Sequence, residues 1–152
     1  MYIWLVIAFL TIVLDQVSKA LIVANFSLSD HFTFLPGVID IVYVKNTGAA
    51  FSMFESHTWI LGAVSVLFSV AILIYMFKTK PQDKLLLISA GLFLGGALGN
   101  GIDRIFRHFV VDFIELTLFK FPVFNIADIA ITVGAVLVVL QVLTEKETKE
   151  EK

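Results

Sequence analysis

Four long runs of apolar residues alternate with more polar stretches along this 152-residue chain. The apolar runs cover approximately residues 3–24, 59–77, 85–101 and 126–143. An α-helix rises about 1.5 Å per residue, so each run approaches the length needed to cross roughly 30 Å of hydrocarbon. The pattern predicts four transmembrane helices, with connections at 25–58 and 102–125, a short loop at 78–84 and a charged, frayed tail at 144–152.

The first run could also be a cleaved signal peptide. It has no basic segment at its start, it contains Asp15, and no small-x-small cleavage site follows it. We therefore interpret it as a retained transmembrane helix. Asp15 and Lys19 are one helical turn apart and are predicted to pair on one face.

The connection at 25–58 contains two segments rich in β-branched and aromatic residues, His31-Phe-Thr-Phe and Val38–Lys45. Pro36-Gly37 lies between them and is typical of a turn. The pattern predicts two short strands. The small and aromatic residues from Asn46 to Phe54 are interpreted as a short interfacial helix.

Composition supports lipid as the solvent. The chain is 59% hydrophobic and 16% charged, whereas soluble domains carry about 25% charged residues. A single polytopic domain is the natural interpretation. The net charge of −2 provides no basic field for nucleic acid, and the absence of cysteine excludes disulfides and thiol chemistry. The three histidines are scattered without an HExxH motif, so we expect no zinc site and interpret them as loop residues.

The distribution of Lys and Arg predicts the orientation. The 78–84 loop and the tail hold six of these residues, and the 25–58 and 101–125 connections hold four. The excess places both termini and the 78–84 loop in the cytoplasm.

This orientation predicts that four aspartates converge. The first helix starts inside and reaches Asp15 after about 20 Å, in the outer half of the membrane. The third helix ends near Asp103, the fourth begins near Asp128, and Asp112 belongs to the outer connection. All four carboxylates are expected at the outer face.

The aspartates differ in their neighbours. Asp15 has Lys19 one turn on, and Asp103 is followed by Arg104, which we expect to pair with an acid. A neighbouring cation keeps a carboxylate ionised, which suits a structural ion pair.

Asp112 and Asp128 have no cation beside them in the sequence. If they meet, they are predicted to share one proton, as in aspartic proteases. Asp128 also fits a helix N-cap, and from spacing alone structural or transport roles for both acids stay open. Glu115 competes with Asp112 but is interpreted as solvated. Asn100 and Asn125, each three residues before an aspartate, are predicted to hydrogen-bond the carboxylates or a substrate backbone.

Five blocks of residues occur in order along nearly the whole chain: Asp15-Gln-Val-Ser-Lys19, Asn46-Thr-Gly-Ala-Ala-Phe-Ser52, Gly95–Arg104, Val110-Val-Asp-Phe113 and Phe124-Asn-Ile-Ala-Asp128. Together with the four spans, these blocks resemble the bacterial lipoprotein signal peptidases (signal peptidase II). The resemblance implies an all-α integral membrane fold of four transmembrane helices, a small extracytoplasmic β-platform and a short interfacial helix. The platform would use strands within 32–45 and part of 109–121, and the helix would lie around 48–55.

The resemblance implies an aspartic endopeptidase of the bacterial inner membrane, the target of the antibiotic globomycin. Its partners would be membrane lipids and prolipoproteins that carry diacylglycerol on the lipobox cysteine, with cleavage just before that cysteine. No metal or organic cofactor and no nucleic acid is implied, and a monomer is expected. The catalytic pair falls on Asp112 and Asp128. The supporting residues fall on Asp15, Lys19, Asn46, Gly48, Asn100, Asp103, Arg104, Asn125 and Ala127.

Two other classes of function fit the sequence less well. A small transporter that relays protons would need acids spread through the membrane depth, whereas these are predicted to gather at one face. A non-enzymatic membrane assembly factor needs no polar cluster.

Overall fold

Four long helices dominate the computed structural model, which describes residues 2–48 and 58–150, with side chains as far as residue 144. The interfacial helix expected at 48–55 lies, apart from Gly48, outside these residues. Each helix contains a stretch long and apolar enough to cross a membrane, so the predicted helical membrane fold with a small sheet is confirmed. The elements in chain order are α1 (Ile3–Asn25), β1 (His31–Leu35), β2 (Ile39–Asn46), α2 (Thr58–Thr79), α3 (Lys84–Phe106), β3 (Val110–Leu116) and α4 (Ile126–Glu150).

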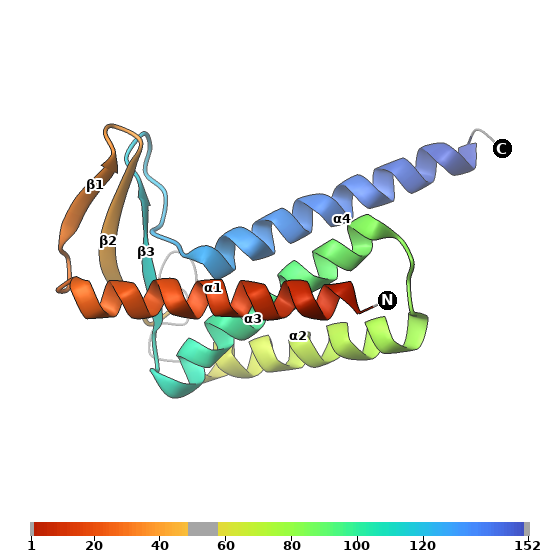
Figure 1. The fold of residues 1–152 in the computed structure, drawn as a ribbon, viewed down its shortest axis with the longest axis horizontal. Coiled ribbons are helices and arrows are strands. Elements are labelled where there is room, and N and C mark those ends of the chain that lie inside the picture. The colour runs from red at the N-terminus through yellow and green to blue at the C-terminus, as the bar shows by residue number, and fades with distance from the viewer. Residues whose placement is uncertain (1, 49–57, 151–152) are drawn as a thin grey trace.

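The helices lie alongside one another, with successive helices running in opposite directions, and the three strands form a sheet at one end of them (Figure 1). Both termini and the α2–α3 connection lie at the opposite end (Figure 1). The loops predicted to share one side of a membrane therefore lie at one end of the molecule.

Helix α3 is the central helix, because α1, α2 and α4 each pack against it. Small residues allow these close approaches. A Cβ atom on Gly95 would lie 2.5 Å from the Cβ of Thr11 in α1, and one on Gly96 would lie 2.6 Å from the carbonyl oxygen of Ala127 in α4. Any larger residue at either position would push a neighbouring helix away.

Large apolar side chains of the three outer helices point outward. Phe9 of α1 is 64% exposed, Leu67 of α2 is 69% exposed and Val139 of α4 is 58% exposed. A soluble protein rarely exposes apolar patches of this extent, so these surfaces match a lipid environment.

The sheet is antiparallel with strand order β1-β2-β3, and both strands predicted in the first connection are present. Gly37 adopts a φ of +73° in the turn between β1 and β2, a conformation that glycine adopts without steric cost. Val111 and Phe113 of β3 are buried against Ile22 of α1 and Tyr43 of β2. This small core fixes β3, and with it Asp112, to the end of α1.

Two helices extend by five residues or more beyond their predicted ends. Helix α3 continues past residue 101 to Phe106, so Asp103 and Arg104 lie in the helix and not in a connection. The buried carboxylate of Asp103 and the hydrogen bond from the Arg107 N–H to the Asp103 carbonyl oxygen, 2.8 Å, hold this last turn. Helix α4 continues to Glu150 through the predicted frayed tail, where Glu and Lys are good helix formers.

Candidate active site

Eight polar side chains from α1, β2, α3, β3 and α4 form one network at the sheet end of the helices. Six of them are 4% exposed or less, so each must find a hydrogen-bond or ionic partner to offset the loss of water. The four aspartates that were predicted to converge all belong to this network. Its members are Asp15, Lys19, Asn46, Asn100, Asp103, Asp112, Asn125 and Asp128.

Lys19 is the centre of a fully buried ion cluster. Its Nζ lies 2.8 Å from Asp15 Oδ2 and 3.0 Å from Asp103 Oδ2, and it donates to Asn100 Oδ1 at 2.9 Å. An ammonium group has three N–H donors, and these three partners match them in number. The predicted pair of Asp15 and Lys19 is confirmed, and the cluster joins α1 to α3.

The cations that pair with Asp103 are not the one expected from the sequence. Asp103 pairs with Lys19 and, at 3.6 Å, with Nε of Arg107, and it also accepts the Val111 N–H at 3.2 Å. Arg104 forms no ion pair with any described residue. Consecutive helical residues point in different directions, whereas residues four apart share a face, so Arg107 and not Arg104 reaches the carboxylate.

Arg104 instead lines the cavity that contains Asp112 and Asp128. Its buried Nε has no hydrogen-bond partner within the described part of the chain. A buried donor without a partner is costly, and here it is next to the carboxylates of a cavity. Arg104 therefore contributes a positive charge to the wall of this cavity.

Two asparagine amides link the ion cluster to the other two aspartates. Asn100 accepts from Lys19 through Oδ1 and donates from Nδ2 to Asp128 Oδ1 at 2.8 Å. Asn125 donates from Nδ2 to Asn100 Oδ1 at 3.0 Å and to Asp112 Oδ1 at 2.6 Å. The prediction that both asparagines hydrogen-bond carboxylates is confirmed, but Asn100 serves Asp128 and not Asp103, its neighbour in sequence.

Asn125 and Asp128 also form a reciprocal cap on α4. The Asp128 N–H donates to Asn125 Oδ1 at 3.0 Å, and the Asn125 N–H donates to Asp128 Oδ2 at 3.1 Å. This is the capping-box arrangement, which fixes both side chains at the first turn of a helix. The N–H of Ala127 donates to Asp15 Oδ1 at 3.0 Å, so the ion cluster holds the same turn. Asp128 therefore both caps its helix and faces the cavity.

Asp112, on β3, is held by the side-chain amides of two asparagines. Asn46 of β2 donates to Asp112 Oδ2 at 2.8 Å, Asn125 donates to Oδ1, and the Gly48 N–H fixes Asn46 by donating to its Oδ1 at 3.0 Å. Burial raises the pKa of Asp112 to about 6, and the charge of Asp128 adds to the rise, while the hydrogen bonds from Asn46 and Asn125 oppose it. Asp112 can therefore hold or release a proton near neutral pH.

Asp112 and Asp128 line one cavity of about 230 Å³. Neither forms an ion pair with a described residue. The volume admits several water molecules, each of which occupies about 30 Å³ in the liquid. Two carboxylates on one wet cavity can carry out general acid–base chemistry on a bound water. Asn46, Asn100, Arg104, Val110, Phe121, Pro122, Val123 and Phe124 form the rest of the wall.

All eleven residues predicted for the site lie in or beside this network, but sequence reasoning missed two further side chains that contact it. Gln16 Nε2 is 3.1 Å from both Asp15 Oδ2 and the Gly99 carbonyl oxygen, and Arg107 pairs with Asp103. Gln16 could have been suspected as a polar residue inside an apolar helix. Gly99 also matters, because a Cβ there would lie 2.6 Å from Asp15 Oδ2.

The sheet carries a separate group of ionisable side chains. His31, Asp40 and Glu115 come from the three strands, and their potential metal-ligand atoms all lie within 4.8 Å of one another. His31 Nδ1 is 3.6 Å from Glu115 Oε2, and the His31 side chain is 59% exposed. His31 therefore lies in the first of the two predicted strands, and its interpretation as a loop residue is wrong. This group lies outside the aspartate cavity.

Comparison with known proteins identifies the class. The fold is that of bacterial membrane enzymes: one solved structure described in this way, determined by the in meso method at 2.3 Å resolution, matches with a TM-score of 0.93 at 29% identity, over 100% of this chain and 94% of the other. A second, at 1.9 Å resolution, matches with a TM-score of 0.86 at 29% identity, over 94% of each chain. Residues 7–144 match the signal peptidase (SPase) II family, Peptidase_A8, and the chain belongs to that family.

The protein is therefore a membrane peptidase of the family that processes lipoprotein signal peptides. The resemblance stated from the five sequence blocks is confirmed. The family match decides against the transporter and the assembly factor.

Proposed function

We propose that this protein is an aspartic endopeptidase that removes the signal peptide from diacylglyceryl-modified prolipoproteins and cleaves just before the lipidated cysteine. Asp112 and Asp128 are its catalytic pair. The observation that supports this most is the cavity that both carboxylates line, where amide groups and not cations hold them. A carboxylate held in this way can exchange a proton without breaking an ion pair.

The proposed reaction uses one carboxylate as base and the other as acid. The ionised carboxylate takes a proton from a water molecule, and the water oxygen attacks the scissile carbonyl carbon. The protonated carboxyl group donates to the carbonyl oxygen and stabilises the tetrahedral intermediate. The carbon–nitrogen bond then breaks as the leaving amine takes a proton from the pair. The raised pKa of Asp112 suits this reaction, because it lets the pair keep one proton up to a pH of about 6, well above the ordinary range of an aspartate.

Arg104 and Asn46 are proposed to position the substrate. Both line the aspartate cavity, and the unpartnered Nε of Arg104 is a donor for a carbonyl oxygen of the substrate backbone. The Lys19 cluster is proposed to hold α1, α3 and the start of α4 in register. It acts on the reaction through Asn100, which contacts both Lys19 and Asp128.

The signal helix of the substrate is proposed to lie against α3 between α2 and α4. An apolar groove of about 220 Å³ lies there, lined by Ala71, Ile72, Tyr75 and Met76 of α2, Leu86, Ala90 and Phe93 of α3, and Val138 of α4. Both outer helices pack on α3, so the groove opens sideways toward lipid. A helical substrate could enter it without leaving the bilayer.

We propose the bacterial inner membrane as the location, with both termini in the cytoplasm and the aspartates at the outer face. The positive-inside rule supports this orientation, since the end of the molecule that holds the termini also holds the Lys-rich loop (Figure 1). The chain is proposed to act as a single polytopic domain and as a monomer, because one chain contributes all the residues of the network, the aspartate cavity and the apolar groove.

The direct test is a gel-shift assay with purified protein in detergent. A lipidated prolipoprotein should lose its signal peptide, and mass spectrometry should place the new N-terminus at the lipidated cysteine. The same precursor without lipid should be cleaved far more slowly. Cleavage at another bond, or equal cleavage of both precursors, would contradict the proposal.

A further inference from the structure

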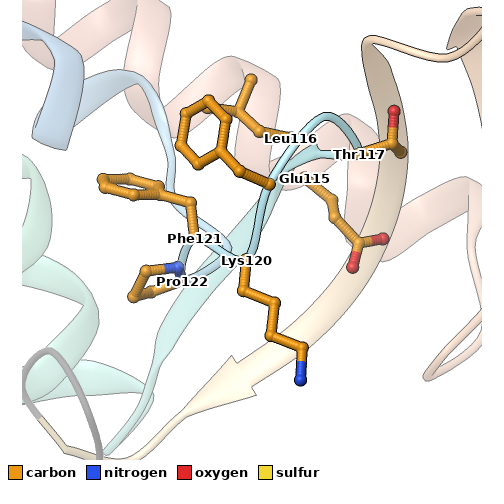
Figure 2. Close-up of a pocket in the computed structure, with 7 residues that line it drawn as sticks. Glu115, Leu116, Thr117, Lys120, Phe121 and Pro122 are labelled. Atoms are coloured by element: carbon orange, nitrogen blue, oxygen red, sulfur yellow. The ribbon is translucent and has the colours of Figure 1, made fainter.

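A second groove lies directly beside the aspartate cavity. It has a volume of about 440 Å³ and lies between the end of β3 and the segment that leads to α4 (Figure 2). Two of its residues, Phe121 and Pro122, also line the aspartate cavity, so the two spaces share a wall. The groove is lined by Glu115, Leu116, Thr117, Phe119, Lys120, Phe121 and Pro122.

The groove combines an aromatic wall with one unpaired cation. The rings of Phe119 and Phe121 are 6.2 Å apart in an edge-to-face arrangement. Lys120 is exposed and forms no ion pair or hydrogen bond with any residue in 2–48 or 58–144. In Figure 2 the side chains of Lys120 and Glu115 extend away from Phe121 and Pro122.

Glu115 does not neutralise Lys120. Its carboxylate is 3.6 Å from His31 Nδ1, and in the sheet it is directly opposite Asp40. The Glu115 carboxylate therefore has its own partner on the sheet, although Glu115 also lines the groove, and no described acid pairs with Lys120. An occupant with a negative charge and a flexible backbone would complement it.

We propose that this groove binds the polypeptide that follows the lipidated cysteine. Lys120 favours an acidic side chain at the second to fourth residues of the mature chain, in which the cysteine is the first residue. The inference rests on the proposed function. With the scissile bond at the aspartates and the signal helix in the bilayer, the rest of the substrate must leave on the side of the sheet. An extended chain advances about 3.3 Å per residue, so three residues span roughly 10 Å. The shared wall of Phe121 and Pro122 leads such a chain from the cavity into the groove.

An anionic lipid headgroup is the main competing occupant, because lysine beside aromatic residues is also common at membrane interfaces. The shared wall favours the peptide, since it ties the groove to the space in which the bond is cut and not to the lipid-facing helices. The two occupants predict different results, because peptide binding depends on the substrate sequence and headgroup binding depends on the lipid.

The test uses three lipidated precursors with the same signal peptide and cysteine, which carry Asp, Ser or Lys at the second to fourth residues of the mature chain. Steady-state cleavage is measured in a neutral detergent for the wild type, Lys120→Glu and the control Lys78→Glu. Lys78 is a lysine at the opposite end of the molecule, near the end of α2. The wild type and Lys78→Glu should show a KM about threefold lower for the Asp precursor than for the Lys precursor, as one exposed ion pair provides. Lys120→Glu should reverse this order.

A wild-type KM that is the same for the Asp and Lys precursors, or an order unchanged by Lys120→Glu, would overturn the proposal. An effect of Lys120→Glu on cleavage that appears only in bicelles with anionic lipid, and that is equal for all three precursors, would also overturn it. That result would assign Lys120 to lipid headgroups. Failure of the proposed function looks different. In that case the wild type cleaves none of the precursors, and the groove proposal is lost with it. Normal cleavage of the Ser precursor with no charge preference removes the groove proposal alone.

Discussion

The molecule contains two pairs of aspartates at the same end of its helices, and their surroundings differ in one respect. Asp15 and Asp103 share the ammonium group of Lys19, at 2.8 and 3.0 Å. Asp112 and Asp128 receive hydrogen bonds from asparagine amides and a backbone N–H, and neither has an ion pair among the described residues. Removing the charge of a carboxylate that pairs with a buried cation would leave that cation without its partner, which is costly. The second pair carries no such cost, which supports the proposal that it is the pair that exchanges protons.

Asn100 lies where the two pairs meet. Its oxygen accepts from Lys19 and its amide nitrogen donates to Asp128. A neutral amide therefore lies between the ammonium group and Asp128, the proposed catalytic carboxylate, and links their positions. The comparison supports the proposal that the first pair stabilises the fold and the second pair reacts.

The largest effect should come from removing the charge of either member of the second pair. Asp112→Asn and Asp128→Asn should each lower the rate of cleavage of a lipidated precursor by about 100-fold or more, which is the range for a lost general acid or base. The fold should persist, because asparagine fills the same space. Rates and the thermal unfolding temperature in detergent should be measured together.

Asp40→Asn is the matched control, since Asp40 is a carboxylate of the same sheet that lies outside the cavity. It should retain normal turnover. Near-normal turnover by either Asp112→Asn or Asp128→Asn would remove the assignment of that residue to the reaction.

Breaking the first pair should reduce stability. Lys19→Met removes the cation and leaves Asp15 and Asp103 buried together, which costs about 3–5 kcal/mol for a broken buried ion pair. The loss should appear as a lower unfolding temperature in detergent and a lower yield. Lys84→Met, at the exposed start of α3, is the control and should unfold like the wild type. A Lys19→Met protein that is stable but inactive would mean that Lys19 belongs to the chemistry.

Replacing Gly99 by alanine should disturb the first pair less than the loss of Lys19 does. A Cβ in Gly99→Ala would lie 2.6 Å from Asp15 Oδ2, and overpacking of this kind typically costs about 1–3 kcal/mol. At Gly62 the nearest atom would be 3.4 Å away, so Gly62→Ala makes the same chemical change with ordinary contacts. The first variant should unfold at a lower temperature than the wild type, and the second at the same or a higher temperature. Equal behaviour would show that Asp15 can shift without loss.

The sequence was sufficient to predict the spans, the pair of Asp15 and Lys19, and the meeting of four aspartates. These features depend on helix length, periodicity and loop charge, which are local properties. It was not sufficient to identify Lys19 as a cation that pairs with Asp103. Lys19 and Asp103 come from different helices, and their contact depends on how closely α1 and α3 pack, which glycines such as Gly95 determine. Chain adjacency pointed to Arg104, but the helix directs that side chain to the aspartate cavity.

The most sensitive test of the difference between the two pairs removes one asparagine amide that hydrogen-bonds the second pair. The quantity to follow is kcat/KM as a function of pH. The pKa of Asp112 is raised to about 6, so the alkaline limb of kcat/KM, which reports loss of the proton from the pair, should lie near pH 6. Asn46 donates to Asp112 Oδ2 and favours the ionised form, so Asn46→Ala should raise this pKa and move the limb to higher pH. One hydrogen bond is worth about 0.5–1.5 kcal/mol, which limits the shift to about one pH unit. Asn25→Ala, at an exposed asparagine that bonds only the Leu21 carbonyl oxygen among the described residues, should leave the limb in place. If Asn46→Ala lowers the rate but leaves the limb at the wild-type pH, then Asn46 positions the substrate and does not tune Asp112.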